Sequence, residues 1–205
     1  MAIATTSSID YIDGIEAEPV KTSSVDAAYS DPDLLIREYF LSSSAQRAKS
    51  RATVAQHIGG IKAVFSILSW GASGKARDGF DGAVNLLAET KNSELLSSAC
   101  QAAETLYPQM YANARTRVFA ERFLEILIKA IACAYQINAN QRLSLLSQLL
   151  TLVNNRITKA SLIDALVIIS DEVDINAVKE AIKTFTHSSD QYIGDYALEA
   201  LQDLA

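Results

Sequence analysis

Histidine and cysteine, which often carry catalysis and metal binding, are scarce in this chain of 205 residues. The chain has two of each: His57, His187, Cys100 and Cys133. Their spacing is not that of a zinc site, and no Gly-x-Ser-x-Gly motif accompanies the histidines. The acidic residues are scattered, and no pair lies in an apolar stretch that would separate their pKa values. The sequence therefore predicts no catalytic residue, no metal site and no cofactor, and it favours a protein that is not an enzyme.

Long apolar runs are also absent. The apolar stretch 124–135 is interrupted by Glu125 and Lys129, and no run approaches the roughly 18 residues that a membrane-spanning helix needs. The first residues show neither the basic-then-apolar order of a secretory signal nor the arginine content of a transit peptide. We therefore expect a cytoplasmic protein without a transmembrane segment, in which both cysteines are reduced and buried.

The glycine-rich run 69–82, SWGASGKARDGFDG, contains a Gly-Lys pair that a phosphate-binding loop would use. Such a loop also needs a leading glycine, a hydroxyl residue directly after the lysine and a preceding β-strand. In this run Ser69 stands at the position of the leading glycine and Ala76 follows Lys75, while the residues before the run have helical periodicity. We interpret the run as a joint between helices.

Acidic residues are missing from one segment of the chain. Residues 39–77 contain no Asp or Glu and have a net charge of +6, whereas residues 1–34 sum to −6 and residues 164–205 to −7. A basic segment can bind an acidic protein, an anionic membrane or nucleic acid, or it can simply face solvent. The isoelectric point near 4.9 argues against nucleic acid. The candidate partner-binding residues are Arg47, Lys49, Arg51, Lys62, Lys75 and Arg77.

Strand patterns are absent, and apolar residues recur at helical spacing from residue 31 onward. We expect a flexible acidic tail over residues 1–30 and a single all-α domain over 31–205. Within the domain, the composition suggests a basic helical section over 31–70, a glycine-rich joint over 71–82 and repeat-like helices over 83–205.

Several helix boundaries carry their own signals. Asp31 before Pro32 is typical of a helix start, and Asn138, Asp174 and Asp190 are expected to cap later helices. A helix that begins near residue 93 is expected to end near Pro108, because proline interrupts helical hydrogen bonding. The longest of the predicted helices, of which there are nine or ten, then runs over 113–136.

The segment 174–204, DINAVKEAIKTFTHSSDQYIGDYALEALQDL, contains a helix, a polar turn with Asp190 and a second helix that mixes small and large apolar residues. This pattern resembles a HEAT-type helical repeat, although Gly194 stands where that family commonly has a basic residue. Residues 80–106 show a weaker version. The resemblance implies a right-handed α-solenoid of stacked antiparallel helix pairs, and an irregular helical bundle is the alternative.

HEAT-type proteins commonly bind other proteins, so the resemblance implies a non-enzymatic scaffold or adaptor. We expect the partner to be a protein whose acidic surface contacts the basic residues of segment 39–77, whose charge the acidic tail balances. A homo-oligomer is also possible. The alternative is a cofactor- or pigment-handling assembly factor, lyase- or chaperone-like, with an apolar pocket beside the long helix. The apolar stripe of that helix is Phe119, Phe123, Leu127, Ile131 and Tyr135.

Overall fold

The computed structural model describes residues 31–205, and within this range it has ten α-helices, a short 3-10 helix and no strand. The all-α prediction is therefore confirmed for these residues, whereas the predicted acidic tail, residues 1–30, lies outside them. The helices are α2 (Pro32–Leu41), α3 (Ser44–His57), α4 (Gly60–Ser73), α5 (Gly79–Ala88), α6 (Ser93–Ala112), α7 (Arg117–Ala132), α8 (Ala139–Leu149), α9 (Arg156–Ile169), α10 (Ile175–Lys183) and α11 (Gln191–Asp203), with the 3-10 turn η1 (Ser170–Glu172) between α9 and α10.

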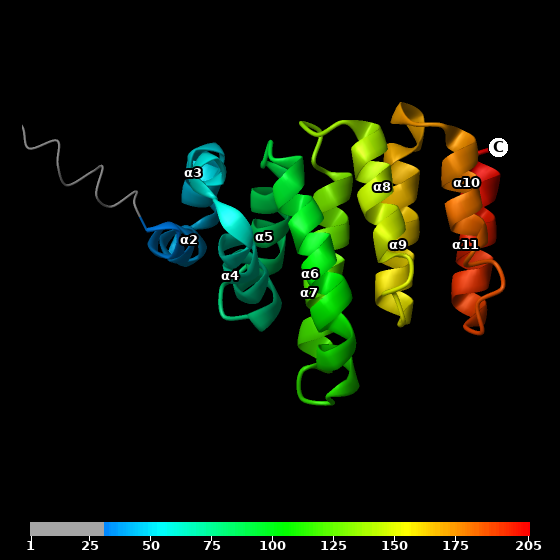
Figure 1. Cartoon of the computed structure of the whole chain (residues 1–205), viewed down its shortest axis with the longest axis horizontal. Coiled ribbons are helices and arrows are strands. Elements are labelled where there is room, and N and C mark those ends of the chain that lie inside the picture. Colours follow the sequence, from blue (N-terminus) through cyan, green and yellow to red (C-terminus); the bar gives the residue numbers. More distant parts are fainter. Residues whose placement is uncertain (1–30) are drawn as a thin grey trace, which may run out of the picture.

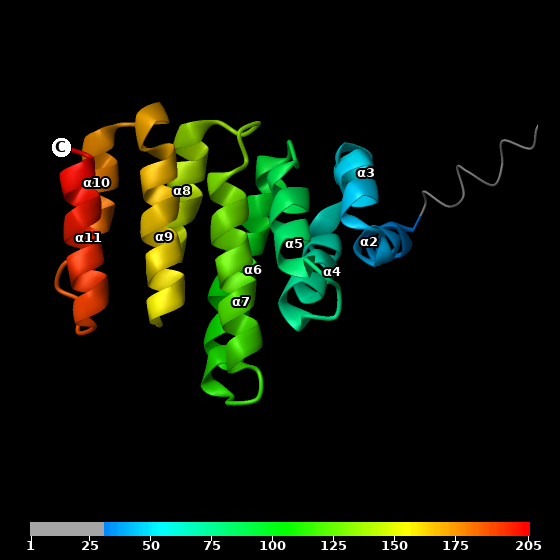
Figure 2. The same cartoon turned by 180° about the vertical axis from the view of Figure 1, so that it is seen from behind.

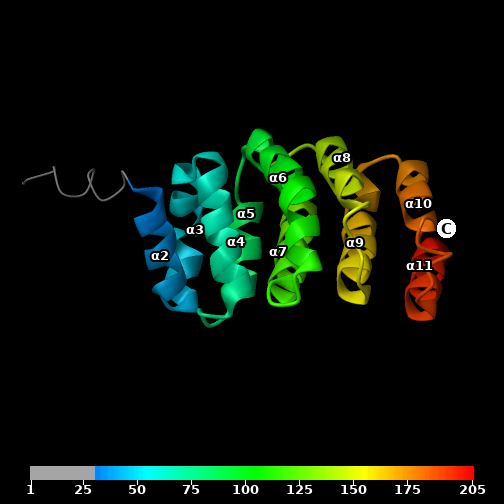
Figure 3. The ribbon, with the colours of Figure 1, turned by 60° about the horizontal axis from the view of Figure 1, so that its bottom comes forward.

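The helices form a row of neighbouring pairs (Figure 1). Each even-numbered helix contacts the odd-numbered helix that follows it, and α3, α5, α7, α9 and α11 contact one another in that order. Figure 2 shows the layer formed by α5, α7, α9 and α11 in front. The tilted view of Figure 3 keeps the pairs in sequence order. No helix within residues 31–205 has both the length and the apolar character that crossing a membrane requires.

Helix α7 forms the centre of the core. It contacts α4, α5, α6, α8 and α9, and most of its circumference is buried. From the predicted stripe, Phe123, Leu127 and Ile131 are buried, whereas Phe119 is half-buried and Tyr135 is exposed. Burying one large aliphatic side chain contributes about 1.5–3 kcal/mol, so α7 holds the pairs on either side of it together.

The predicted helix caps are confirmed. The carboxylates of Asp31, Asp174 and Asp190 accept the amide N–H two residues further on, at 3.0–3.1 Å. Asn138 does the same for α8 at 2.9 Å. Each bond satisfies one of the free N–H groups of a first helical turn. Local capping thus fixes where these four helices begin.

The predictions for the end of α6 and for the longest helix are wrong. Helix α6 includes Pro108 and runs on to Ala112, so it is the longest of the described helices at 20 residues, whereas α7 has 16. Pro108 lies on an exposed face, where water can replace the hydrogen bond that a proline removes. The turn forms later, where Asn113 accepts from the Arg115 N–H at 3.0 Å and the Thr116 hydroxyl donates to the Met110 carbonyl at 2.6 Å.

The glycine-rich joint is shorter than the predicted 71–82. Only residues 74–78 lie outside helices, and Gly74, with a φ of 67°, ends α4 in the left-handed conformation that glycine adopts without strain. Gly71 lies inside α4, where an added Cβ would stand 2.5 Å from the Ala83 Cβ. The glycine therefore lets α4 and α5 approach closely, and the joint is a packed corner.

Candidate functional site

The structure separates the six predicted basic residues, and Arg47 is buried. Its guanidinium donates to the carbonyls of Phe40 at 3.3 Å and Ser42 at 2.9 Å, at the C-terminal end of α2. It also donates to the carbonyl of Arg77 at 3.0 Å and lies 3.8 Å from the Asp78 carboxylate. Arg47 therefore connects the end of α2 to the α4–α5 loop, and with 6% of its surface exposed it offers a partner very little.

Two further basic residues are separated from the α4–α5 loop. Arg51 is half-buried and pairs with Glu89 at 3.4 Å, and Glu89 also accepts a hydrogen bond from Gln136 at 3.3 Å. Lys62 is exposed in the first turn of α4, about 20 Å along the helix axis from Lys75 at a rise of 1.5 Å per residue. The basic segment is therefore not one continuous patch.

Lys49, Lys75 and Arg77 are exposed, and the last two lie in the loop beside a hollow at the end of α4. The hollow has a volume of about 370 Å³ and is lined by Ser69, Trp70, Ser73, Lys75 and Phe119. Trp70 is half-buried and its ring stacks on that of Phe40 at 5.7 Å. The hollow thus combines an aromatic lining with a flanking cation.

Arg122 on α7 adds a cation that sequence reasoning missed. Its side chain is exposed, and Nη1 lies 3.8 Å from the point where a Cβ on Gly74 would stand. Helix packing alone brings it to the α4–α5 loop, so the linear sequence carries no signal for this proximity. We refer to Lys75, Arg77 and Arg122, together with Trp70 and Phe119, as the basic corner.

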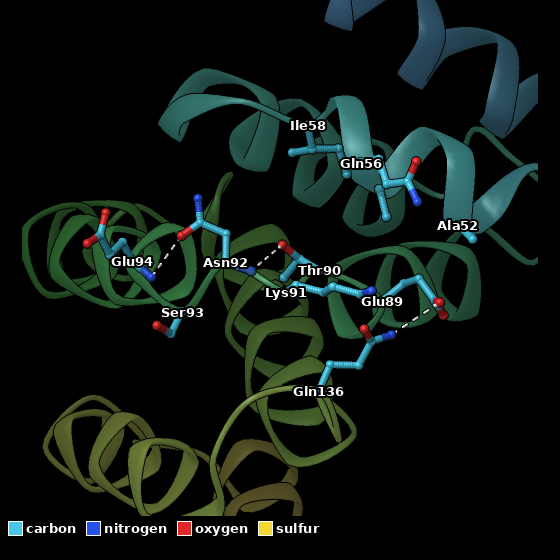
Figure 4. Close-up of a pocket in the computed structure, with 11 residues that line it drawn as sticks. Ala52, Gln56, Ile58, Glu89, Thr90, Lys91, Asn92, Ser93, Glu94 and Gln136 are labelled. Carbon is cyan, nitrogen blue, oxygen red and sulfur yellow. Dashed lines mark hydrogen bonds between the residues drawn. The ribbon is translucent and has the colours of Figure 1, made fainter.

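A groove of about 540 Å³ lies between the end of α3 and the α5–α6 loop (Figure 4). Several of its polar side chains form hydrogen bonds at that loop. Thr90 accepts from the Asn92 N–H at 3.2 Å, and the Asn92 side chain accepts from the Glu94 N–H at 3.0 Å. Gln136, on the far side, donates to Glu89. These bonds hold the α5–α6 loop in place at the edge of the groove.

Reactive side chains are not gathered at one place. Within residues 31–205, no three His, Cys, Asp or Glu side chains lie close enough together to hold a metal ion. Both cysteines are free, but only Cys100 is buried as predicted, because Cys133 is half-buried. Burial raises the pKa of the Cys100 thiol to about 12, which keeps it protonated and unreactive at neutral pH.

Arg142 is a second buried arginine that sequence reasoning missed. It donates to the Ala132 carbonyl at 2.7 Å and to the Glu172 carboxylate at 2.5 Å. The guanidinium carbon also lies 5.4 Å from the centroid of the Tyr135 ring. A signal was present, because Arg142 precedes Leu145, Leu146 and Leu149 at helical spacing and therefore shares the apolar face of α8.

Comparisons of this chain with family models, with curated proteins and with solved structures find no match.

Proposed function

We propose that this chain is a non-enzymatic, cytoplasmic helical scaffold that binds another protein, and that its helix pairs stack as a right-handed HEAT-like α-solenoid. The proposal is supported by the order of the row, in which the α2–α3 pair and the α10–α11 pair lie at opposite ends (Figure 1). A bundle would instead gather its helices around one axis. Stacks of helix pairs offer extended surfaces, which is why binding is their common role.

The basic corner is the observation that carries the proposal. The half-buried rings of Trp70 and Phe119 line the hollow together with Lys75, Arg122 lies beside Gly74, and Arg77 is exposed in the same loop. Aromatic side chains and arginine are enriched where proteins bind one another, and surface cations attract an acidic partner. We therefore expect a partner segment that has an apolar side chain among carboxylates.

The acidic N-terminal segment, outside the described residues, has such a composition. Residues 9–15, IDYIDGI, place isoleucine and tyrosine beside two aspartates. We expect this segment to compete with the partner for the basic corner, so deletion of residues 1–30 should tighten partner binding. An unchanged affinity would show that the tail does not compete.

The test is affinity capture from the native host with a triple variant, Lys75→Glu, Arg77→Glu and Arg122→Glu. The control variant carries Lys62→Glu, Lys91→Glu and Lys183→Glu, three exposed lysines outside the corner with the same total charge change. We expect wild type and control to retain a stoichiometric partner with an acidic surface and the corner variant to lose it. Equal capture by all three proteins would contradict the proposal.

The alternative function, an assembly factor for a cofactor or pigment, requires a ligand pocket beside α7. From the stripe on α7, Phe123, Leu127 and Ile131 pack into the core, so only Phe119, which lines the hollow at the end of α4, could contact such a ligand. Native mass spectrometry of the protein purified from its host tests it directly, because a stoichiometric small molecule would favour the assembly factor over the scaffold.

A further inference from the structure

A second surface lies near the other end of the row, between α9 and α11, the last two odd-numbered helices in Figure 2. The two helices line a hollow of about 540 Å³, which we call the α9–α11 groove. Its lining combines apolar side chains with carboxylates and includes no basic residue: Ile163, Asp164, Val167, Ile168, Tyr196, Glu199, Ala200 and Asp203.

The apolar part of this groove is open to solvent. Ile168 is 46% exposed although it is a β-branched aliphatic residue, and Val167 beside it is half-buried. On the α11 side Ala200 contributes only a small side chain to the lining, between Tyr196 and Asp203. The Tyr196 hydroxyl donates to the Asp164 carboxylate and connects the two helices across the groove. An apolar side chain of a partner therefore has a floor to contact.

The charge around this floor has one sign. Asp164, Glu199 and Asp203 are all exposed, and residues 164–205 have a net charge of −7. Arg156, at the start of α9, is already bound by two hydrogen bonds of 2.8 and 3.0 Å to Asp190. Lys159 follows within the same first turn and is not part of the lining. The rim thus presents carboxylates to whatever occupies the apolar floor.

The length of the groove fits a short helical segment. On α11 the lining extends from Tyr196 to Asp203, about 10 Å along the axis and therefore about two helical turns. An amphipathic helix places apolar residues at i, i+3 and i+4 on such a floor, and lysines or arginines beside this stripe reach the rim.

We propose that the α9–α11 groove docks a basic amphipathic helix of a partner protein. The apolar floor contributes burial, and the carboxylates of Glu199 and Asp203 contribute charge complementarity and select against acidic helices. This site uses residues distinct from the basic corner, and the proposal stands or falls independently of the function proposed above.

The test uses the full chain and a fluorescein-labelled amphipathic peptide of leucine and lysine, about four helical turns long. Its binding is followed by fluorescence anisotropy, with a leucine–glutamate peptide as the negative control. The groove variant is Glu199→Lys with Asp203→Lys. The matched variant is Glu180→Lys with Asp195→Lys, which makes the same charge change at exposed positions outside the groove.

We expect the groove variant to weaken binding of the lysine peptide by about tenfold or more and the matched variant by less than about threefold. Ile168→Ser should weaken binding about threefold or more, because it removes apolar area from the floor. All these positions are exposed, so the fold should be retained, as circular dichroism will verify.

Equal losses in the groove and matched variants would overturn the proposal, because binding would then reflect only the overall negative field. An unchanged affinity in Ile168→Ser would overturn it as well. Sedimentation of the full chain adds a further outcome: a dimer that Glu199→Lys with Asp203→Lys dissociates would assign the groove to a second copy. Reversing the cations of the basic corner should leave peptide binding intact, so this test is separate from that of the scaffold function.

Discussion

The N-terminal and C-terminal parts of the row each contain a buried arginine, and the two are compensated differently. Arg47 donates to three backbone carbonyls, those of Phe40, Ser42 and Arg77, and its nearest carboxylate is 3.8 Å away. Arg142 donates to one carbonyl and forms a close ion pair with Glu172. Both connect the end of one helix to a later segment of the chain.

The comparison shows two ways to bury a guanidinium. A buried cation is tolerated only when acceptors replace the water that it loses. Neutral carbonyls supply most of those acceptors for Arg47, and the exposed Asp78 carboxylate, at 3.8 Å, is its only charged partner within 4 Å among residues 31–205. For Arg142 a carboxylate also neutralises the charge, although its buried Nε has no hydrogen-bond partner in the described part of the chain, and its side chain is 0% exposed against 7% for Arg47. Substitution of Arg142 should therefore be the more damaging of the two.

The largest effect is expected for Arg142→Ala. It removes a fully buried side chain, leaves the Ala132 carbonyl without its donor and leaves Glu172 without its cation. The loss of unfolding free energy should be about 3 kcal/mol, the lower end of the range for breaking a buried pair, because the Glu172 side chain is 45% exposed. Urea denaturation followed by circular dichroism measures this loss.

Arg142→Met serves as the control, because it keeps most of the volume and removes the charge. It should lose clearly less than Arg142→Ala, since apolar residues often replace a buried pair at little cost. A loss below about 1 kcal/mol in Arg142→Ala would show that the bonds from Arg142 to Ala132 and Glu172 do not stabilise the fold.

A smaller effect, about 2 kcal/mol, is expected for Arg47→Ala. Three carbonyls lose a charged donor, but only the bond to Phe40 is buried, whereas those to Ser42 and Arg77 are half-buried, at a helix end and in a loop. Arg47→Lys should recover only part of this loss, because an ammonium group cannot supply the planar fork of a guanidinium. The same denaturation measurement applies.

Arg51→Ala is the matched control on the same helix, because Arg51 is half-buried and pairs with Glu89. Pairs of this kind contribute about 0–1 kcal/mol. If Arg51→Ala and Arg47→Ala lower the unfolding free energy equally, the burial of Arg47 adds no stability beyond that of a half-buried ion pair.

These two arginines also mark the limit of sequence reasoning. Caps such as Asp31 and Asp174 are local, because the acceptor lies two residues from its donor, and the sequence predicts them correctly. The acceptors of Arg47 lie 5, 7 and 30 residues away, so a charge pattern that looks like a surface patch is in part buried. No local rule distinguishes Arg47 from exposed Lys49.

The same reason explains why only part of the basic corner could be predicted from the sequence. The sequence locates Lys75 and Arg77 beside the glycine-rich run, but Arg122 reaches Gly74 only because α7 packs against α4. Arg142 was predictable in principle from the leucines that share its face of α8. The turn after Ala112 was hidden because Asn113 and Thr116 close it without a glycine or proline.

The smallest expected effect concerns a third connection, the exposed contact between Tyr196 and Asp164 in the C-terminal part. The hydrogen bond to the carboxylate, followed by burial, raises the pKa of Tyr196 to about 12. An unfolded tyrosine titrates near 10, so the folded state holds this proton more tightly. The contact therefore stabilises the fold below about pH 10, and this stabilisation is lost as the pH rises toward 12.

Tyr196→Phe should consequently lower the unfolding free energy at neutral pH by less than about 1 kcal/mol, because water screens the exposed contact. Between about pH 10 and 12 the variant should lose stability less steeply than the wild type, so the two curves converge. Asp164→Asn should lower the pKa of Tyr196 toward the ordinary value, since it keeps an acceptor but removes the charge. Urea denaturation at several pH values measures these slopes. Parallel curves for wild type and Tyr196→Phe would show that an exposed charged contact, unlike that of Arg142, adds nothing to the connection between neighbouring helices.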